Sequence, residues 1–179
     1  MRTKIKVMTI TAVITLLYAL LASPPTANAA GSCFSGGSST NSFAVKYGAV
    51  NDTWVGYFDT ARTRWNSAGV SASIGKGTSA NRSVTASRYT WSDYGRYYPP
   101  GSSFKIEINA RTLGEAAPSS QSSNWMKSTV THEFGHALKL VDNPLPSSPN
   151  ASLMNHGRNR NTVGSPTSTD KSTVKACYK

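Results

Sequence analysis

The sequence predicts a single α+β domain built on a mixed, twisted β-sheet, with a long helix, an active-site helix and a C-terminal helix. The chain has 179 residues, enough for one hydrophobic core even after an export signal is removed. Short stretches typical of strands fill the middle of the chain, and helical patterns lie before and after them. The order of a strand, a helix, several strands and a helix is typical of this class.

The first segment is predicted to be an export signal and not part of the fold. Basic residues in the first six positions precede an apolar stretch over 7–21 and a small-residue end at Ala27-Asn28-Ala29, the pattern of a cleaved secretory signal peptide. A membrane anchor is the alternative, but the apolar stretch is short for a span. We therefore expect residues 1–29 to be removed and residues 30–179 to be secreted into the extracellular space as one domain.

Two cysteines, Cys33 and Cys177, lie near the two ends of that domain. Disulfides persist outside the cell, so we expect one disulfide between them. Two free thiols are an alternative. A lipoprotein attachment at Cys33 is another, although residues 30–32 lack the large aliphatic residue expected ahead of it.

The chain is strongly basic, with a formal net charge of +11. Its lysines and arginines are scattered and form no dense run, which is typical of a solvated surface and not of a nucleic-acid footprint. We expect no nucleic-acid partner and a monomer. The charge would allow loose association with an anionic cell wall.

Residues 42–69 predict a strand followed by a helix. Residues 42–50 alternate in polarity, and Asn51 or Asp52 suits the N-cap of the next segment. Gly69 ends that segment. Its apolar residues recur at helical spacing and are more readily explained as core than as a binding site: Trp54, Phe58, Ala61 and Trp65.

Three further strands are expected over 70–74, 82–90 and 103–112. The segments between them, 75–81 and 92–101, are rich in turn-forming residues. In the last strand one face is apolar and consists of Phe104, Ile106 and Ile108.

The next expected element is a loop over 114–123, followed by a helix capped by Ser123 or Asn124. His132 and His136 lie one turn apart on this helix, so their imidazoles can converge on one metal ion. Glu133 lies beside them, where a carboxylate can accept a proton from a metal-bound water. The alternative is that this pattern occurs by chance on a surface helix.

A catalytic zinc site needs a third protein ligand and an open position for water. After His136 the only acids are Asp142 and Asp170, and the only histidine is His156. No glutamate follows, which excludes a third ligand of that type. Asp142 is favoured by its position six residues after His136, and the Asn143-Pro144 pair forces the helix to have ended.

These motifs resemble those of the metzincin zinc peptidases, especially the small matrixin-like and snapalysin-like enzymes. The segment from His132 to Asp142 resembles H-E-x-x-H-x-x-G-x-x-H, with Asp at the last position as in the snapalysin-like group. SLMNHG resembles the Met-turn, with Met154 as its methionine, and PTSTDKSTVKACY resembles the start of the C-terminal helix. The resemblance is specific from Thr131 to Tyr178.

The sequence departs from that family in three respects. Lys139 replaces the expected glycine, no cysteine-switch propeptide is recognisable, and no histidines remain for a second zinc. We expect Lys139 to adopt the left-handed conformation at a cost of roughly 1 to 2 kcal/mol. Zinc binding in small sites is worth on the order of 10 kcal/mol, so this strain would be tolerated.

The resemblance implies a secreted zinc metalloendopeptidase that acts on protein or peptide substrates. One Zn²⁺ would be held by His132, His136 and Asp142, with Glu133 as general base and Met154 packed beneath the ion. A calcium site cannot be assigned. By the same resemblance, residues 104–110 would form the edge strand that aligns an extended substrate.

His156 would help to stabilise the transition state; a solvent-facing loop histidine is the alternative. Two other functions are considered. One is a secreted zinc-binding or wall-binding module without efficient turnover, and the other is a toxin or bacteriocin-like protein, which only size and charge favour.

Overall fold

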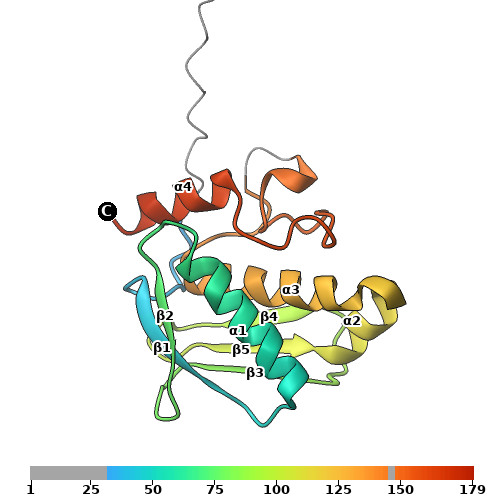
Figure 1. Cartoon of the computed structure of the whole chain (residues 1–179). Helices are drawn as coiled ribbons and strands as arrows, with labels where there is room; N and C mark the ends of the chain where they lie inside the picture. Colours follow the sequence, from blue (N-terminus) through green and yellow to red (C-terminus); the bar gives the residue numbers. More distant parts are fainter. Residues whose placement is uncertain (1–31, 145–147) are drawn as a thin grey trace, which may run out of the picture.

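The computed structural model describes residues 32–144 and 148–179, and Figure 1 shows the arrangement of their helices and strands. The predicted signal peptide lies outside the described residues. In chain order the main elements are β1 (Ser42–Tyr47), α1 (Asp52–Asn66), β2 (Ser73–Lys76), β3 (Ser83–Ser87), β4 (Gly95–Tyr98), β5 (Lys105–Asn109), α2 (Ala110–Ala116), α3 (Ser122–Ala137) and α4 (Ser168–Cys177). No helix among the described residues has the length and apolar character needed to cross a bilayer.

The strands form one mixed sheet in the order β2-β1-β3-β5-β4, which confirms the predicted α+β class. The first four strands in this order run parallel, and β4 pairs antiparallel with β5. Helices α1 and α3 lie side by side over one face of the sheet (Figure 1). The sheet and these two helices enclose the hydrophobic core.

The edge strand next to α3 differs from the prediction. The sequence predicts an edge position for 104–110, but β5 lies between β3 and β4, so β4 is the edge strand. β4 falls inside 92–101, for which the turn-forming residues predict a loop. All four residues of β4 are partly buried, so the strand has no buried face opposite an exposed one. Its sequence therefore lacks the alternation of apolar and polar residues by which a strand is recognised.

Helix α1 is capped as predicted, since the Asn51 side chain accepts a hydrogen bond from the backbone N–H of Trp54 at 3.2 Å. Three of the four aromatic and apolar residues expected in the core are fully buried, and Trp54 is partly buried. The indole N–H of Trp65 donates to the carbonyl of Thr131 at 2.8 Å. This bond ties α1 to the middle of α3, one residue before His132.

Helix α2 was not predicted. The strand expected over 103–112 ends at Asn109, whose side-chain oxygen accepts hydrogen bonds from the backbone N–H groups of Arg111 and Thr112. A side chain that caps a helix start in this way turns the chain out of the sheet. Helix α3 then begins at Ser122, with Gln121 at the N-cap position in place of the expected Ser123 or Asn124, and it has no side-chain cap.

The predicted disulfide between Cys33 and Cys177 is confirmed, with 144 residues of sequence separation. It joins the first described residues to the last residue of α4. Cys33 forms an isolated antiparallel bridge with Leu140, and the backbone N–H of Phe34 donates to the carbonyl of Lys139 at 2.7 Å. The two ends of the domain therefore meet beside the C-terminus of the helix that carries the histidines.

Candidate metal centre

Helix α3 presents His132 and His136 on one face, with ring centroids 4.9 Å apart. Each Nδ1 faces a backbone carbonyl, that of Leu153 at 3.1 Å for His132 and that of Leu140 at 2.9 Å for His136. Because a carbonyl only accepts hydrogen bonds, Nδ1–H must be the donor, which leaves Nε2 free in a neutral ring. Such carbonyl partners orient histidines that ligate metals.

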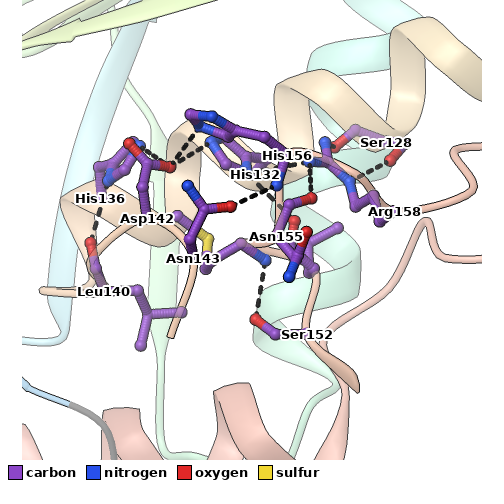
Figure 2. Close-up of polar contacts among 12 residues, drawn as sticks. Ser128, His132, His136, Leu140, Asp142, Asn143, Ser152, Asn155, His156 and Arg158 are labelled. Atoms are coloured by element: carbon purple, nitrogen blue, oxygen red, sulfur yellow. Dashed lines mark hydrogen bonds and ion pairs between the residues drawn. The ribbon is translucent and has the colours of Figure 1, made fainter. Parts of the chain in front are cut away.

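The chain leaves α3 through Lys139, which has φ 67°. The expected left-handed conformation is confirmed, and the turn brings the chain back towards the histidines. Figure 2 shows the resulting cluster, in which three imidazole rings surround the Asp142 carboxylate. Oδ1 of Asp142 lies 3.1 Å from Nε2 of His132, 3.5 Å from Nε2 of His136 and 2.9 Å from Nε2 of His156.

These distances fit a shared metal ion. Ligands of a tetrahedral zinc ion with bonds of about 2.05 Å lie about 3.3 Å apart, close to the three values above. Among the described residues, ligand atoms of His132, Asp142 and His156 all lie within 4.8 Å of one another and form a candidate metal-binding triad. The predicted set has His136 in place of His156, and both histidines contact the same carboxylate oxygen.

The loop that carries His156 is tied to the Asp142 loop through Asn143. The side-chain oxygen of Asn143 accepts from the backbone N–H of His156 at 2.9 Å, and the backbone N–H of Asn143 donates to the carbonyl of Met154 at 3.0 Å. Asn143 adopts a left-handed conformation with φ 46°, which asparagine tolerates better than most residues. The two loops thus fold as one wall of the site.

Met154 is fully buried and packs against α3. A Cβ added to Gly135 would lie 2.5 Å from its sulfur, so only glycine lets the helix approach this closely. The carboxylate of Asp170 holds the loop in place, since it accepts from the Ser152 hydroxyl at 2.5 Å and from the Leu153 backbone N–H at 2.9 Å. Asp170 therefore has a structural role and is not a metal ligand.

Burial and charge set the protonation of the cluster. Burial and the nearby Arg158 lower the pKa of His132 to about 3, which keeps the ring neutral at physiological pH. Burial alone would raise the pKa of the Asp142 carboxyl, but its contacts with the three surrounding imidazoles hold it well below its usual range. The neutral His132 thus directs the lone pair of Nε2 at the negatively charged Oδ1 of Asp142. A metal cation between these two atoms would be attracted by both.

Arg158 contacts the opposite ring nitrogen of His132, with Nη1 3.2 Å from Nδ1. This contact would favour the other tautomer of the ring. However, the same Nη1 donates to the carbonyl of Asn155 at 3.1 Å and the guanidinium also donates to Ser128, so Arg158 has partners without the histidine. A buried carbonyl at Leu153 needs its donor, and we therefore assign the proton of His132 to Nδ1.

Glu133 lies beside the cluster, 4% exposed, and burial raises its pKa to about 7. Gly95 on the edge strand packs directly against it, and a Cβ there would lie 2.5 Å from Oε1. A cleft of about 760 Å³ is lined by β4, by the metal-binding cluster and by Glu133. The sequence motif thus identified His132, Glu133 and His136, whereas it gave no signal for Gly95 or Arg158.

No protein-family model matches the chain, and no curated protein matches it. A solved structure described as the GM1-bound form of the ECX AB5 holotoxin contains a chain with a similar fold, at a TM-score of 0.62 and 12% identity. The match covers 83% of this chain and 87% of that chain. Identity this low shows similarity of fold alone.

These findings correct the assignment drawn from the motifs. The assignment to the metzincins, and to the matrixin-like and snapalysin-like peptidases in particular, is wrong on these comparisons, because no family model matches and the similarity of fold is to a holotoxin chain. The secreted endopeptidase function that rested on that assignment is overturned with it, as is its alternative of a binding module. Within the described residues, the fold is a mixed five-stranded sheet with four α-helices, similar to a chain of an AB5 holotoxin.

Proposed function

We propose that this chain is a zinc-dependent hydrolase of toxin-like fold. The observation that carries the proposal is the placement of a neutral, buried His132 lone pair 3.1 Å from the carboxylate of Asp142. Two electron-rich groups repel each other at this distance unless a proton or a metal cation lies between them. Because the proton of His132 is assigned to Nδ1, where it meets the carbonyl of Leu153, a metal cation is favoured. Histidine and carboxylate ligands in a tetrahedral spacing favour zinc over calcium or magnesium.

The ligands in this proposal are His132, His136 and Asp142. The two helix histidines are preferred because each is oriented by a carbonyl at Nδ1. His156 faces the same oxygen from an exposed loop, with 60% of its side chain accessible. It is therefore the group best able to move aside and leave a coordination position for water or substrate.

A bound zinc ion would supply a Lewis acid that acidifies a coordinated water and polarises a substrate carbonyl. Glu133 would accept the proton of the attacking water on its carboxylate and deliver it to the leaving group. Its burial and raised pKa suit it to hold a proton for part of the cycle. His156, at the exposed end of the cluster, would donate a hydrogen bond to negative charge that develops on the substrate.

Two features support a protein that acts outside the cell. A disulfide that closes nearly the whole domain is consistent with secretion, and so is the likeness of fold to a holotoxin chain. The toxin hypothesis, which size and charge alone favour at the level of sequence, thereby gains a structural argument. We propose that the domain is secreted. We also propose that it acts on a macromolecular substrate, because the cleft runs beside β4, one of the two edge strands of the sheet.

The test measures zinc and hydrolysis separately. We expect about one zinc per chain after loading, and chelator-sensitive hydrolysis of at least one member of a panel that contains an unstructured protein, short peptides and esters. Glu133→Gln should keep the zinc and lower the rate by about 10² to 10⁴-fold. Glu115→Gln, which removes an exposed carboxylate from α2, is the matched control.

The two measurements address different parts of the proposal. A chain that binds no zinc under any loading condition would refute the proposal outright. A chain that binds zinc and hydrolyses nothing on the panel would refute the hydrolase and leave only the metal site.

A further inference from the structure

One wall of the metal cleft carries two guanidinium groups, those of Arg158 and Arg160. The carboxylates of the cleft do not pair with them directly. Asp93 is paired with Arg96 at 2.7 Å, Asp142 is surrounded by histidines, and Glu133 is nearly inaccessible. Within the described part of the chain, neither Arg158 nor Arg160 forms an ion pair.

The two arginines differ in how their hydrogen bonds are used. Arg158 is 3% exposed and donates to Ser128 and to the carbonyl of Asn155. Arg160 is only partly buried, and its Nε is inaccessible yet has no hydrogen-bond partner among the described residues. The guanidinium of Arg158 is therefore used in hydrogen bonds within the fold, whereas that of Arg160 can still donate hydrogen bonds to a ligand.

Aromatic rings hold Arg160 in place without neutralising it. Its guanidinium lies 4.7 Å from the ring centre of Tyr94 and 5.2 Å from that of Trp125. Such stacking leaves the edge of the guanidinium plane, where its N–H groups lie, free for a ligand. Burial lowers the pKa of both arginines, and the charge of Arg160 further lowers the pKa of Arg158.

We propose that Arg160 is a specificity residue that binds a carboxylate on the substrate within the metal cleft. A planar guanidinium can hold a carboxylate through two parallel hydrogen bonds. The inference rests on the proposed function, because it concerns what enters the cleft beside the metal. It also explains why a desolvated pair of like charges is kept on this wall, since a bound anion relieves their repulsion.

The test measures binding and not turnover. The probes are fluorescently labelled hexapeptides of alanine and glycine in which one Glu is moved along the chain, each matched by the same peptide with Gln. Fluorescence anisotropy with zinc-loaded Glu133→Gln protein prevents hydrolysis during the measurement. We expect at least one Glu peptide to bind about tenfold tighter than its Gln partner.

Variants assign that preference to one side chain. Arg160→Gln should abolish the difference between Glu and Gln peptides while the affinity for the Gln peptide stays within about twofold, since only a charge-assisted contact is lost. Arg160→Lys should retain part of the preference, because the charge remains without the planar fork. Arg88→Gln, which removes an exposed arginine outside the cleft, should leave it intact.

Several results would overturn the proposal. They are equal binding of every Glu and Gln pair, a preference that survives Arg160→Gln, and an equal loss of both affinities in Arg160→Gln, which would mean a structural role. Absence of binding by all the peptides counts against it as well. A Glu preference in a chain that hydrolyses nothing would uphold Arg160 and reject the hydrolase, so the two proposals fail separately.

Discussion

The side chains of the metal-binding cluster come from two regions, a buried helix and two exposed loops. His132 and His136 project from a helix that is packed on the sheet core, and their side chains are 6% and 13% exposed. Asp142 and His156 project from loops, and their side chains are 41% and 60% exposed. Regular structure holds the first pair, whereas the second pair depends on a few specific contacts.

This difference indicates that the two regions respond differently to change. The backbone of the helix residues is supported by the whole core, so their positions are lost only when the domain unfolds. The loop residues rely on Asn143, Asp170 and the disulfide-bonded segment next to Leu140. The loop side should therefore be the place where zinc affinity can change while the fold remains intact.

The largest expected effect comes from removing the loop ligand itself. Asp142→Ala should lower zinc affinity by more than about a hundredfold, the upper range for changes to groups that only support a ligand. Far-ultraviolet circular dichroism should stay unchanged, because Asp142 is not part of the core. Asp142→His should restore zinc binding in part.

A specific pattern would contradict this ligand assignment. If Asp142→Ala binds zinc as tightly as the unmodified protein and His156→Ala does not, the third ligand is His156.

The disulfide gives the next largest effect. Replacing Cys33 and Cys177 by serine should lower the free energy of unfolding by about 2 to 5 kcal/mol, measured by urea titration of the metal-free protein. Zinc affinity of the folded fraction should fall as well, because Cys33 pairs with Leu140, the residue whose carbonyl orients His136. An unchanged zinc affinity would show that the loop around Leu140 keeps its conformation without the disulfide.

A smaller effect is expected at the exposed histidine. His156→Ala should lower kcat by about tenfold on whichever substrate the panel identifies. This is less than the loss of about 10² to 10³-fold for a buried donor to developing charge, because the side chain of His156 is 60% exposed. KM and zinc content should change little. An unchanged kcat would mean that His156 is a solvent-facing loop residue without a role in catalysis.

The smallest effect is expected at the turn that joins the two regions. Lys139→Gly should relieve the left-handed backbone strain, but it also removes the ammonium group that lies 4.5 Å from the ring centre of Tyr178. We expect a net gain of less than about 1 kcal/mol in the free energy of unfolding. Thermal denaturation would measure it, and a lower melting temperature would mean that the Tyr178 contact dominates.

The contrast between the regions also explains what the sequence could predict. Helical spacing is enough to place His132, Glu133 and His136 together, because a regular helix fixes which side chains share a face. Asp142 could be chosen by its distance along the chain, since few other ligands were available. The roles of Asp170, Asn143 and Arg160 depend on how loops fold back on one another, and no local pattern encodes that.

The strand prediction failed where tertiary contacts replace sequence pattern. β4 was missed because its residues are bordered by turn-forming residues and are partly buried on both faces. Its position depends on Gly95, which packs against Glu133 on α3. The family assignment failed for a related reason, since short motifs around a metal site do not determine which family a chain belongs to.

The bridge between Cys33 and Cys177 has a consequence for the order of events during synthesis. A ribosome makes the chain from its N-terminus, so Cys33 waits for its partner until 144 more residues have been added. The disulfide can reinforce the pairing of Cys33 with Leu140 only after the last helix exists and an oxidant has joined the sulfurs. On the proposed function, maturation of the metal cluster would follow completion and oxidation of the chain, and the proposed hydrolysis would begin only in a compartment where disulfides form.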